Sequence, residues 1–130
     1  MEKILWIGAG GAVGAVLRYV VSGAVQEMSR DNGFPYGTLA VNLAGCFLIG
    51  LLTILAETRG VFSSEARAFV FIGVLGALTT FSTFSNETMG LLQAGQTSHM
   101  LKNIAANTGL GLMAVWLGSW LGSMFFGHWG

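Results

Sequence analysis

A stretch of hydroxyl and aromatic side chains, TTFSTFSNE at residues 79–87, follows the apolar sequence FVFIGVLGAL. Hydroxyl groups donate hydrogen bonds, so they can replace the water that an anion loses when it leaves solution. Phe81 and Phe84 are three residues apart and therefore project from one face of a helix. Because an aromatic ring is positive at its edge, two ring edges can contact an anion that the ring faces would repel. The stretch suits a small, strongly hydrated anion that must be partly dehydrated.

Packing is the alternative interpretation of the same residues. Phenylalanines at helical spacing usually fill an apolar interface, and serine and threonine hydroxyls usually bond to the backbone of their own helix. The residues alone leave both interpretations open. The hydroxyl donors of the stretch are Thr79, Thr80, Ser82, Thr83 and Ser85.

Several other polar residues lie within apolar stretches. Arg18 lies late in the first one, where a cation either anchors the chain at the membrane interface or attracts an anion to an aqueous vestibule. Asn42 follows Thr38 by four residues, so both lie on one helix face. An amide in that setting either joins helices or lines a wet path. Asn107 and Thr108 present the same alternatives in the last stretch.

The composition that surrounds these residues is that of a membrane protein. Of the 130 residues, 53% are hydrophobic and 9% are charged, whereas about a quarter of the residues of a soluble domain are charged. Apolar stretches at residues 4–25, 37–56, 66–92 and 101–126 are each long enough for a helix that crosses a bilayer core of about 30 Å. The sequence therefore predicts a single all-α transmembrane domain over residues 1–130, with four helices. We expect neither an enzyme nor a nucleic-acid partner.

The third of these helices is predicted to be broken. Gly73 and Gly76 precede the hydroxyl stretch, glycine weakens a helix, and serine or threonine can satisfy the backbone groups that a break frees. A break near residues 76–80 would offer carbonyls to a cation and would point the positive end of the restarted helix inward. At the start of the third helix, Ser63 or Ser64 is expected to be the cap, with Glu65 in the first turn.

The glycine-rich segment ILWIGAGGAVGAVLR superficially resembles a dinucleotide-binding loop. With glycine at positions 8 and 10, that fingerprint requires glycine at the position of Val13, so the motif does not fit. Gly10 and Gly14 are instead four residues apart, as are Gly118 and Gly122. Because small residues at this spacing let helices approach closely in lipid, we expect the two glycine pairs to pack helices.

The basic residues give no preferred orientation in the membrane. Four spans place both termini and the second loop on one side, and the first and third loops on the other. Lys3, Arg59 and Arg67 fall on the terminal side, and Arg18, Arg30 and Lys102 fall on the opposite side. The positive-inside rule therefore predicts no bias. Two oppositely inserted copies can pair about a two-fold axis in the membrane plane, which leads to the hypothesis of dual topology.

In combination, the segments GGAVGAVLRY, GTLAVN and TTFSTFSNE, in this order in a four-helix chain of this length, closely resemble the Fluc/CrcB fluoride channels. The resemblance covers essentially the whole chain. It implies a passive, fluoride-selective, multi-pass channel of the prokaryotic plasma (inner) membrane. It also implies an antiparallel dual-topology homodimer with two pores along the subunit interface. Such channels let cytoplasmic fluoride, which accumulates as the neutral acid and is trapped as the anion, leak back out.

The same resemblance implies roles for individual residues. Phe81 and Phe84 resemble the paired phenylalanines whose ring edges line the fluoride path, and Asn42 resembles a pore-facing asparagine. The backbone carbonyls of Gly76 and Thr79 resemble those that hold a central structural sodium ion between two subunits. The other expected residues of the fluoride pathway are Arg18, Thr38, Ser82, Thr83 and Ser85, with Glu87, Asn107 and Thr108 as secondary candidates.

One departure and two competing functions bear on this interpretation. The family carries a hydroxyl in the middle of the fourth helix, whereas NTGLGLMAVW has only small or apolar residues after Thr108. A non-transporting assembly subunit would need only the glycine spacing and polar contacts between helices, but it leaves the hydroxyl and phenylalanine residues and the lack of charge bias unexplained. The other competing function is a small multidrug-type exchanger, which also has four helices and dual topology. That mechanism needs a carboxylate inside the membrane to trade protons for cationic drugs, but the first helix has Arg18 instead of an acid. The only acid inside a predicted span is Glu87, late in the third helix.

Overall fold

The computed structural model describes residues 1–30 and 32–127, and these residues contain four helical spans. The first two spans are α1 (Glu2–Met28) and α2 (Tyr36–Arg59). The third comprises α3 (Ser64–Arg67), the π-helical segment η1 (Ala68–Leu75), α4 (Gly76–Leu78) and α5 (Phe81–Gln93). The fourth comprises α6 (Thr97–Ala105), the π-helical segment η2 (Ala106–Leu110) and α7 (Gly111–Phe126). Each span is long and apolar enough to cross a membrane, so the predicted all-α, four-span fold is confirmed.

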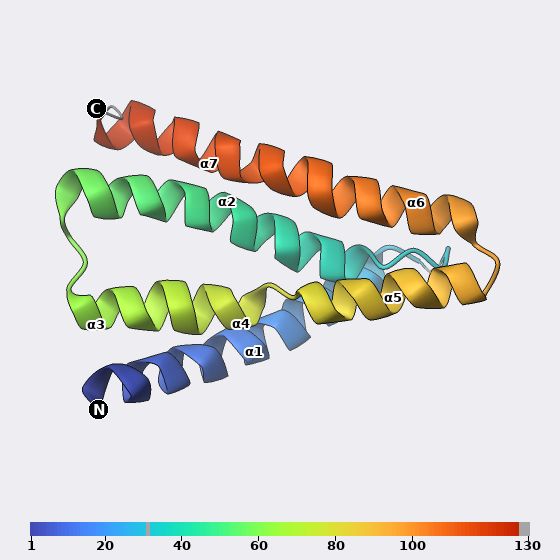
Figure 1. Ribbon diagram of the computed structural model, residues 1–130, viewed down its shortest axis with the longest axis horizontal. Coiled ribbons are helices and arrows are strands. Elements are labelled where there is room, and N and C mark those ends of the chain that lie inside the picture. Colours follow the sequence, from blue (N-terminus) through green and yellow to red (C-terminus); the bar gives the residue numbers. More distant parts are fainter. Residues whose placement is uncertain (31, 128–130) are drawn as a thin grey trace.

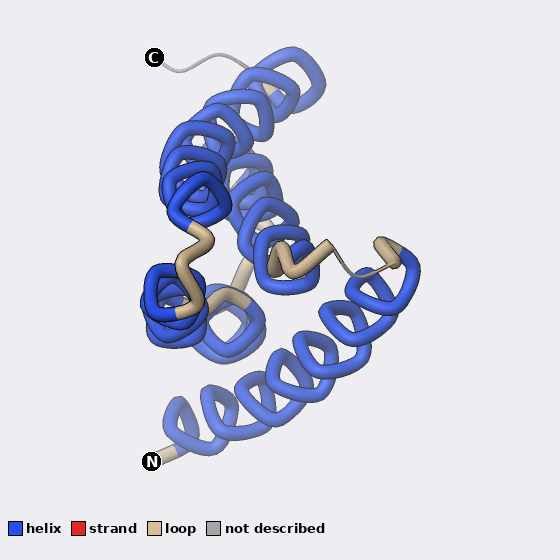
Figure 2. Tube along the Cα trace, turned by 90° about the vertical axis from the view of Figure 1, so that its right-hand side faces the viewer, coloured by secondary structure: helices blue, strands red, loops and turns tan. Residues whose placement is uncertain are grey.

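The four spans run up and down beside one another. Both termini and the connection from α2 to α3 lie at one end, while the connections from α1 to α2 and from α5 to α6 lie at the other (Figure 1). The most extensive contacts join α2 to α7 and α1 to η1. Seen from the end, α1 crosses the other spans at an angle (Figure 2). The predicted side of each loop therefore agrees with the structure.

Glycines permit these two helix contacts. A Cβ atom added to Gly10 or Gly14 would meet a backbone carbonyl of η1, and one added to Gly118 would meet the Phe47 carbonyl of α2. A Cβ atom on Gly122 would lie 2.9 Å from an α2 side chain. Because only glycine leaves space for such close backbones, the expected packing role of both glycine pairs is confirmed.

The third span begins and breaks as the sequence predicts. Ser63 is its cap, since the Ser63 hydroxyl accepts a hydrogen bond from the Ala66 N–H at 3.1 Å. The helix stops after Leu78, because Thr79 (φ −85°, ψ 152°) and Thr80 (φ −151°, ψ 118°) are extended. It restarts in α5, where the Thr80 hydroxyl caps the new helix. The two extended residues lie near mid-span, where lipid offers no hydrogen bonds to freed backbone groups.

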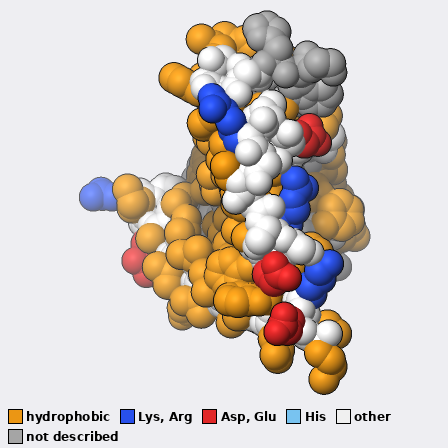
Figure 3. All heavy atoms as spheres, turned by 90° about the vertical axis from the view of Figure 1, so that its left-hand side faces the viewer, with side chains coloured by type: hydrophobic (Ala, Val, Ile, Leu, Met, Phe, Trp, Pro, Cys, Tyr) orange, Lys and Arg blue, Asp and Glu red, His pale blue; other side chains and the backbone are white. Residues whose placement is uncertain are grey.

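Charged side chains are present at the end that carries the termini, and large apolar side chains are exposed along the spans. Figure 3 shows acidic and basic side chains among apolar ones at the end that carries the termini. There Arg67 donates a hydrogen bond to the Ala56 carbonyl at 3.1 Å, close to the C-terminal end of α2. Along the spans, large apolar side chains such as Leu112 and Trp116 are exposed, which suits contact with lipid.

Candidate functional site

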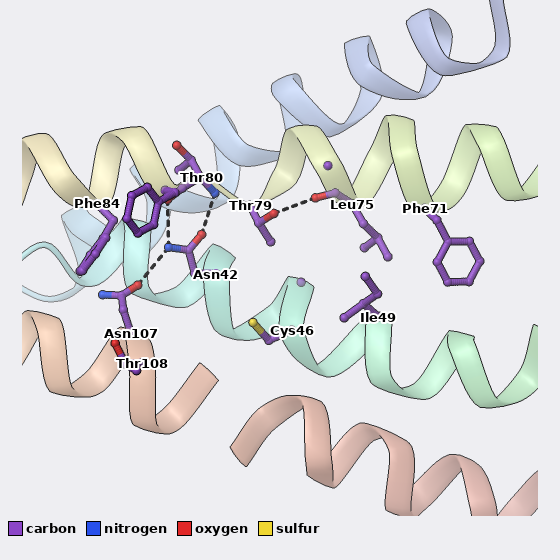
Figure 4. A pocket seen from close by; sticks show the side chains of 13 residues that line it. Asn42, Cys46, Ile49, Phe71, Leu75, Thr79, Thr80, Phe84, Asn107 and Thr108 are labelled. Carbon is purple, nitrogen blue, oxygen red and sulfur yellow. Dashed lines mark hydrogen bonds between the residues drawn. The ribbon is translucent and has the colours of Figure 1, made fainter. Parts of the chain in front are cut away.

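A cavity of about 400 Å³ lies beside the break in the third span (Figure 4). The second, third and fourth spans all contribute to its wall. Most of the lining is apolar, and the polar groups gather near the break. These polar groups come from Asn42, Thr79, Thr80, Asn107 and Thr108. Phe81 and Phe84 line the same cavity, so the structure brings together the amide and aromatic residues that the sequence indicated.

Asn42 of α2 replaces hydrogen bonds that the third span loses at the break. Its Oδ1 accepts a hydrogen bond from the Thr80 N–H at 2.8 Å, and its Nδ2 donates to the Thr80 carbonyl at 3.2 Å. The same Nδ2 donates to Asn107 Oδ1 of η2 at 2.9 Å. Since a carboxamide has two N–H hydrogens, both are used within the chain. Asn42 therefore joins three spans, and its place on an ion path stays a prediction.

Two backbone carbonyls at the break lose their helical donors. In a continuous α-helix the N–H of residue i donates to the carbonyl of residue i−4, so Thr80 would donate to Gly76. The Thr80 N–H instead donates to Asn42. By the same rule Thr83 would donate to Thr79, but its N–H donates to Thr80 Oγ1 at 3.2 Å. Within residues 1–30 and 32–127, neither carbonyl therefore receives the hydrogen bond that a continuous α-helix would give it, and a role for either in binding a cation stays a prediction.

The paired phenylalanines lie one turn apart at the start of α5. The ring centroids of Phe81 and Phe84 are 5.6 Å apart and the ring planes are inclined by 51°. Phe84 is half-buried, whereas Phe81 is 79% exposed. A ring at this exposure stands out from the four-span unit, so little of its surface is covered by its own chain. The predicted placement of both rings on one helix face is confirmed.

A second, smaller hollow of about 220 Å³ lies between α1, α2 and α5. Its polar lining includes the guanidinium-bearing Arg18 and the hydroxyls of Thr38, Thr80 and Thr83. Thr80 borders this hollow as well as the larger cavity, so the broken segment separates the two. The Thr80 and Thr83 hydroxyls are hydrogen-bonded to each other at 3.1 Å. The positively charged Arg18 side chain and several hydroxyls therefore line the same hollow, which the break borders.

Glu87 lies farther along α5 and borders a third hollow of about 400 Å³ next to the first loop. The Thr38 hydroxyl donates a hydrogen bond to Glu87 Oε1 at 2.7 Å. Among residues 1–30 and 32–127, the buried Glu87 Oε2 has no hydrogen-bond partner. Thr38 therefore links the hollow that contains Arg18 to the acid that the sequence singled out within the third span.

Two of the predicted hydroxyls lie away from the cavities just described. Ser82 is exposed and Ser85 is half-buried, and neither lines the hollow beside Phe84 or the one beside Arg18. The Ser82 hydroxyl lies 3.4 Å from that of Thr80. Their contribution to an ion path stays a prediction, because within one chain they lie outside both hollows.

Sequence reasoning missed two polar residues next to the site. Asn103 of α6 is 1% exposed and Thr88 of α5 is 8% exposed. Asn103 Nδ2 donates to the Thr88 hydroxyl at 3.0 Å, and Asn107 Nδ2 donates to Asn103 Oδ1 at 2.9 Å. The four-residue spacing of Asn103 and Asn107 is the one signal in the sequence that could have indicated this pairing.

Comparisons of the sequence with known proteins give one family and a consistent set of relatives. The family model described as "CrcB-like protein, Camphor Resistance (CrcB)" matches residues 5–119. A "Fluoride-specific ion channel FluC" of Shewanella amazonensis is 49% identical over 121 residues, which cover 93% of this chain and 96% of the relative. The FluC of Hydrogenovibrio crunogenus is 46% identical over 125 residues, covering 95% and 93%. "Fluoride-specific ion channel FluC 1" of Methanosarcina acetivorans is 48% identical over 118 residues, covering 91% and 88%.

Proposed function

Because the chain belongs to the CrcB-like family, whose members similar to it over almost their whole length are named fluoride-specific ion channels, we propose that it is a passive fluoride channel. It exports cytoplasmic fluoride across the prokaryotic plasma (inner) membrane. The alternative of a small multidrug-type exchanger has no support among these relatives. In the structure, the observation that carries the proposal is the pair of phenylalanines beside a broken, hydroxyl-rich membrane helix.

The proposed path uses groups that attract an anion and replace its water. Arg18 supplies a positive charge at one hollow, which raises the local concentration of anions. The hydroxyls of Thr38 and Thr83 line that hollow. Thr38 donates its hydrogen to Glu87, whereas Thr83 accepts from Thr80 and can donate its own hydrogen to fluoride. Beyond the break, the edges of Phe81 and Phe84 carry the positive end of the ring quadrupole. Fluoride therefore moves from water to hydroxyls to ring edges, and no step requires a proton or another driving ion.

Asn42 has a more limited role in this proposal than direct donation to fluoride. Both of its amide hydrogens are donated to protein oxygens. We therefore assign it to the wall of the path, where it keeps the break open, and assign donation to the ion to the hydroxyls of Ser82, Thr83 and Ser85. Asn107 and Thr108 line the same cavity and are the contribution of the fourth span.

Exposed groups at the break support assembly with a second, oppositely oriented copy. Phe81 is 79% exposed, and Gly76 is exposed with ample space for a Cβ atom within its own chain. An exposed ring and an exposed glycine on the two sides of a break in a membrane helix suit close contact with another helix. An antiparallel homodimer, with a pore on each side of its two-fold axis, would cover both groups and agrees with the balanced basic residues.

Dual topology predicts that one C-terminal reporter appears on both sides of the membrane. A reporter whose signal depends on its compartment, fused after residue 130, is expected to give signals from both compartments in similar amounts. The matched variant carries three added lysines in the first loop, which should drive every copy into one orientation. A single orientation for the unmodified chain would contradict the antiparallel dimer, while fluoride conduction by the protein is decided by its own test.

We also propose that a structural sodium ion binds at the two-fold axis of the dimer. The carbonyls of Gly76 and Thr79 would hold it, one pair from each subunit, because both have lost their helical donors. When bound, the ion supplies positive charge that stabilises the facing carbonyls of two subunits. The sodium dependence of the thermal stability of the dimer tests this assignment.

Fluoride efflux from liposomes tests the proposed function itself. Purified protein is reconstituted at low density into liposomes loaded with potassium fluoride, and efflux is started with a potassium ionophore and followed with a fluoride electrode. We expect rapid fluoride efflux that is independent of a pH gradient, because a passive path couples fluoride to no proton. Liposomes loaded with chloride are the control and should release little chloride. Absence of fluoride flux in dimeric, folded protein would overturn the function.

A further inference from the structure

We propose that Asn103 and Thr88, neither of which lines the cavity beside the break, are positioning residues that fix the direction of the hydrogen bonds holding the third span open. The proposal rests on the fluoride path described above. It concerns how a chain of hydrogen bonds, beginning at two buried residues outside the cavity, determines which backbone atoms are left unpaired at the break. The chain runs from the Phe84 carbonyl through Thr88, Asn103, Asn107 and Asn42 to the Thr80 peptide group.

The direction of this chain is determined at its first member. A backbone carbonyl can only accept, so the Thr88 hydroxyl must donate its hydrogen to the Phe84 carbonyl, at 2.7 Å. The Thr88 oxygen is then an acceptor for its other neighbour. Asn103 therefore has to turn its NH₂ group towards Thr88, which it does at 3.0 Å. That orientation leaves the Asn103 oxygen pointing towards the next amide.

Each following amide inherits this orientation. Asn107 Nδ2 donates one hydrogen bond to Asn103 Oδ1, at 2.9 Å, and another to the main-chain carbonyl of Asn103, at 3.0 Å. The Asn107 oxygen is thereby left to face α2, where it accepts a hydrogen bond from Asn42 Nδ2 at 2.9 Å. The direction set at Thr88 thus agrees with the one that the Asn103 main-chain carbonyl sets for Asn107, and along the chain to Asn42 each oxygen meets an N–H group rather than another oxygen.

At the far end, the same direction is the only one that suits the break. Asn42 presents its oxygen to the Thr80 N–H, at 2.8 Å, and its remaining N–H hydrogen to the Thr80 carbonyl, at 3.2 Å. A reversed amide would place oxygen against oxygen and NH₂ against N–H. Because Asn42 takes the Thr80 N–H, that group is withheld from the Gly76 carbonyl, and the helix cannot close across the break.

Burial makes this chain sensitive to the loss of any member. Asn103 is 1% exposed and Thr88 is 8% exposed, so water does not readily replace a missing partner. Removing the Thr88 hydroxyl would leave the Phe84 carbonyl without this donor and would let the Asn103 amide rotate. The loss would then be passed to Asn107 and Asn42, since hydrogen bonds in a low-dielectric network reinforce one another. Thr88 and Asn103 therefore act on the path through Asn42 and Phe84 and not by contact with fluoride.

Thr88→Val tests the proposal, because valine keeps the shape of threonine and removes the hydroxyl. We expect a loss of fluoride efflux of about tenfold, the size that follows from one unsatisfied buried group. Thr88→Ser keeps the hydroxyl and is expected to restore most of the flux. Thr58→Val is the control for loss of a threonine hydroxyl. The hydroxyl of the exposed Thr58 makes the same bond to a carbonyl four residues back, at 2.7 Å, and among the described residues it accepts none from an amide.

Hydrogen–deuterium exchange of the backbone over residues 76–84 gives a readout that does not depend on flux. Exchange of the Thr80 N–H is expected to rise in Thr88→Val, to stay near the wild-type rate in Thr88→Ser and to be unaffected in Thr58→Val. Wild-type exchange and wild-type flux in Thr88→Val would overturn the proposal. If the wild-type protein itself conducts no fluoride, the proposed function fails, while the exchange comparison still decides whether Thr88 and Asn103 order the break.

A second variant covers the case in which Thr88→Val does not assemble. Thr88→Cys keeps a weak donor of similar size, so its flux and its exchange are expected to lie between those of Thr88→Ser and the levels predicted for complete loss of the hydroxyl. Flux and exchange in Thr88→Cys that equal those of Thr88→Ser would show that the strength of the hydroxyl donor does not matter. That result would contradict a positioning role for the chain.

Discussion

Asn42→Asp is expected to reduce fluoride efflux by about a hundredfold. The substitution replaces an NH₂ group that donates to the Thr80 carbonyl and to Asn107 Oδ1 with an oxygen that faces both acceptors. Each unsatisfied buried group costs about 1–3 kcal/mol, and about 1.4 kcal/mol corresponds to a factor of ten. A carboxylate at this position also repels an anion in surroundings of low dielectric. Both effects act in the same direction, so the loss should exceed that of any single hydroxyl.

The measurement is the initial rate of fluoride efflux from liposomes that contain equal amounts of dimer. Asn32→Asp is the matched control, because Asn32 is an exposed loop residue whose Nδ2 donates to the Tyr36 hydroxyl at 3.4 Å. Water can replace that bond, so wild-type flux is expected. A rate for Asn42→Asp within twofold of wild type would show that neither the amide donors nor the charge at this wall affects the path.

The same position links flux to the sodium assignment. In Asn42→Leu the Thr80 N–H has lost its acceptor and can return to the Gly76 carbonyl, as in a continuous helix. Replacing sodium with a large organic cation is expected to lower the melting temperature of the wild-type dimer, since the folded dimer then loses the bound ion that stabilises it. The melting temperature of Asn42→Leu should be insensitive to the exchange of cations. Equal sensitivity in both proteins would argue that the Gly76 carbonyl is not a sodium ligand.

The sequence predicts the spans and the break because both depend on local properties. Hydropathy over about 20 residues indicates a membrane helix whatever its neighbours are. Gly76 followed by threonines indicates a weakened helix, and Ser63 before Glu65 indicates a cap. The helices nevertheless extend past the predicted apolar stretches. Hydropathy falls at the membrane interface, but backbone hydrogen bonds continue through the polar ends, as in α5, which reaches Gln93.

The hydrogen-bond partners of the site could not be derived in the same way. Asn42 and Asn107 are 65 residues apart in the chain, and which atom of each amide faces the other depends on a third and a fourth partner. Asn103 and Thr88 carry no distinctive motif, since single amides and hydroxyls are common in membrane helices. Their importance follows from burial and from the hydrogen bond between Asn103 and Thr88, and both are properties of the packed spans.

Phe81→Ile and Phe84→Ile are each expected to reduce fluoride efflux by about tenfold, and the double variant by more than about tenfold but less than about a hundredfold. Isoleucine keeps an apolar, lipid-compatible side chain but has no positive ring edge, and a well-oriented ring contact contributes about 0.5–1.5 kcal/mol beyond its area. The two rings lie 5.6 Å apart, so their losses need not add strictly. Phe84 is half-buried against its own chain and Phe81 is 79% exposed. Phe81→Ile should therefore leave the stability of the single four-span unit unchanged.

Efflux rates, with size-exclusion profiles of the same samples, separate a lost ring edge from a lost dimer. Phe125→Ile is the control, because Phe125 is 70% exposed on α7 and lies outside the cavities beside the break. It should conduct at the wild-type rate. Reduced efflux in Phe81→Ile or Phe84→Ile with an intact dimer assigns the loss to the path itself. Wild-type efflux in both would mean that ring edges do not contact fluoride, and the hydroxyls alone would then have to replace its water.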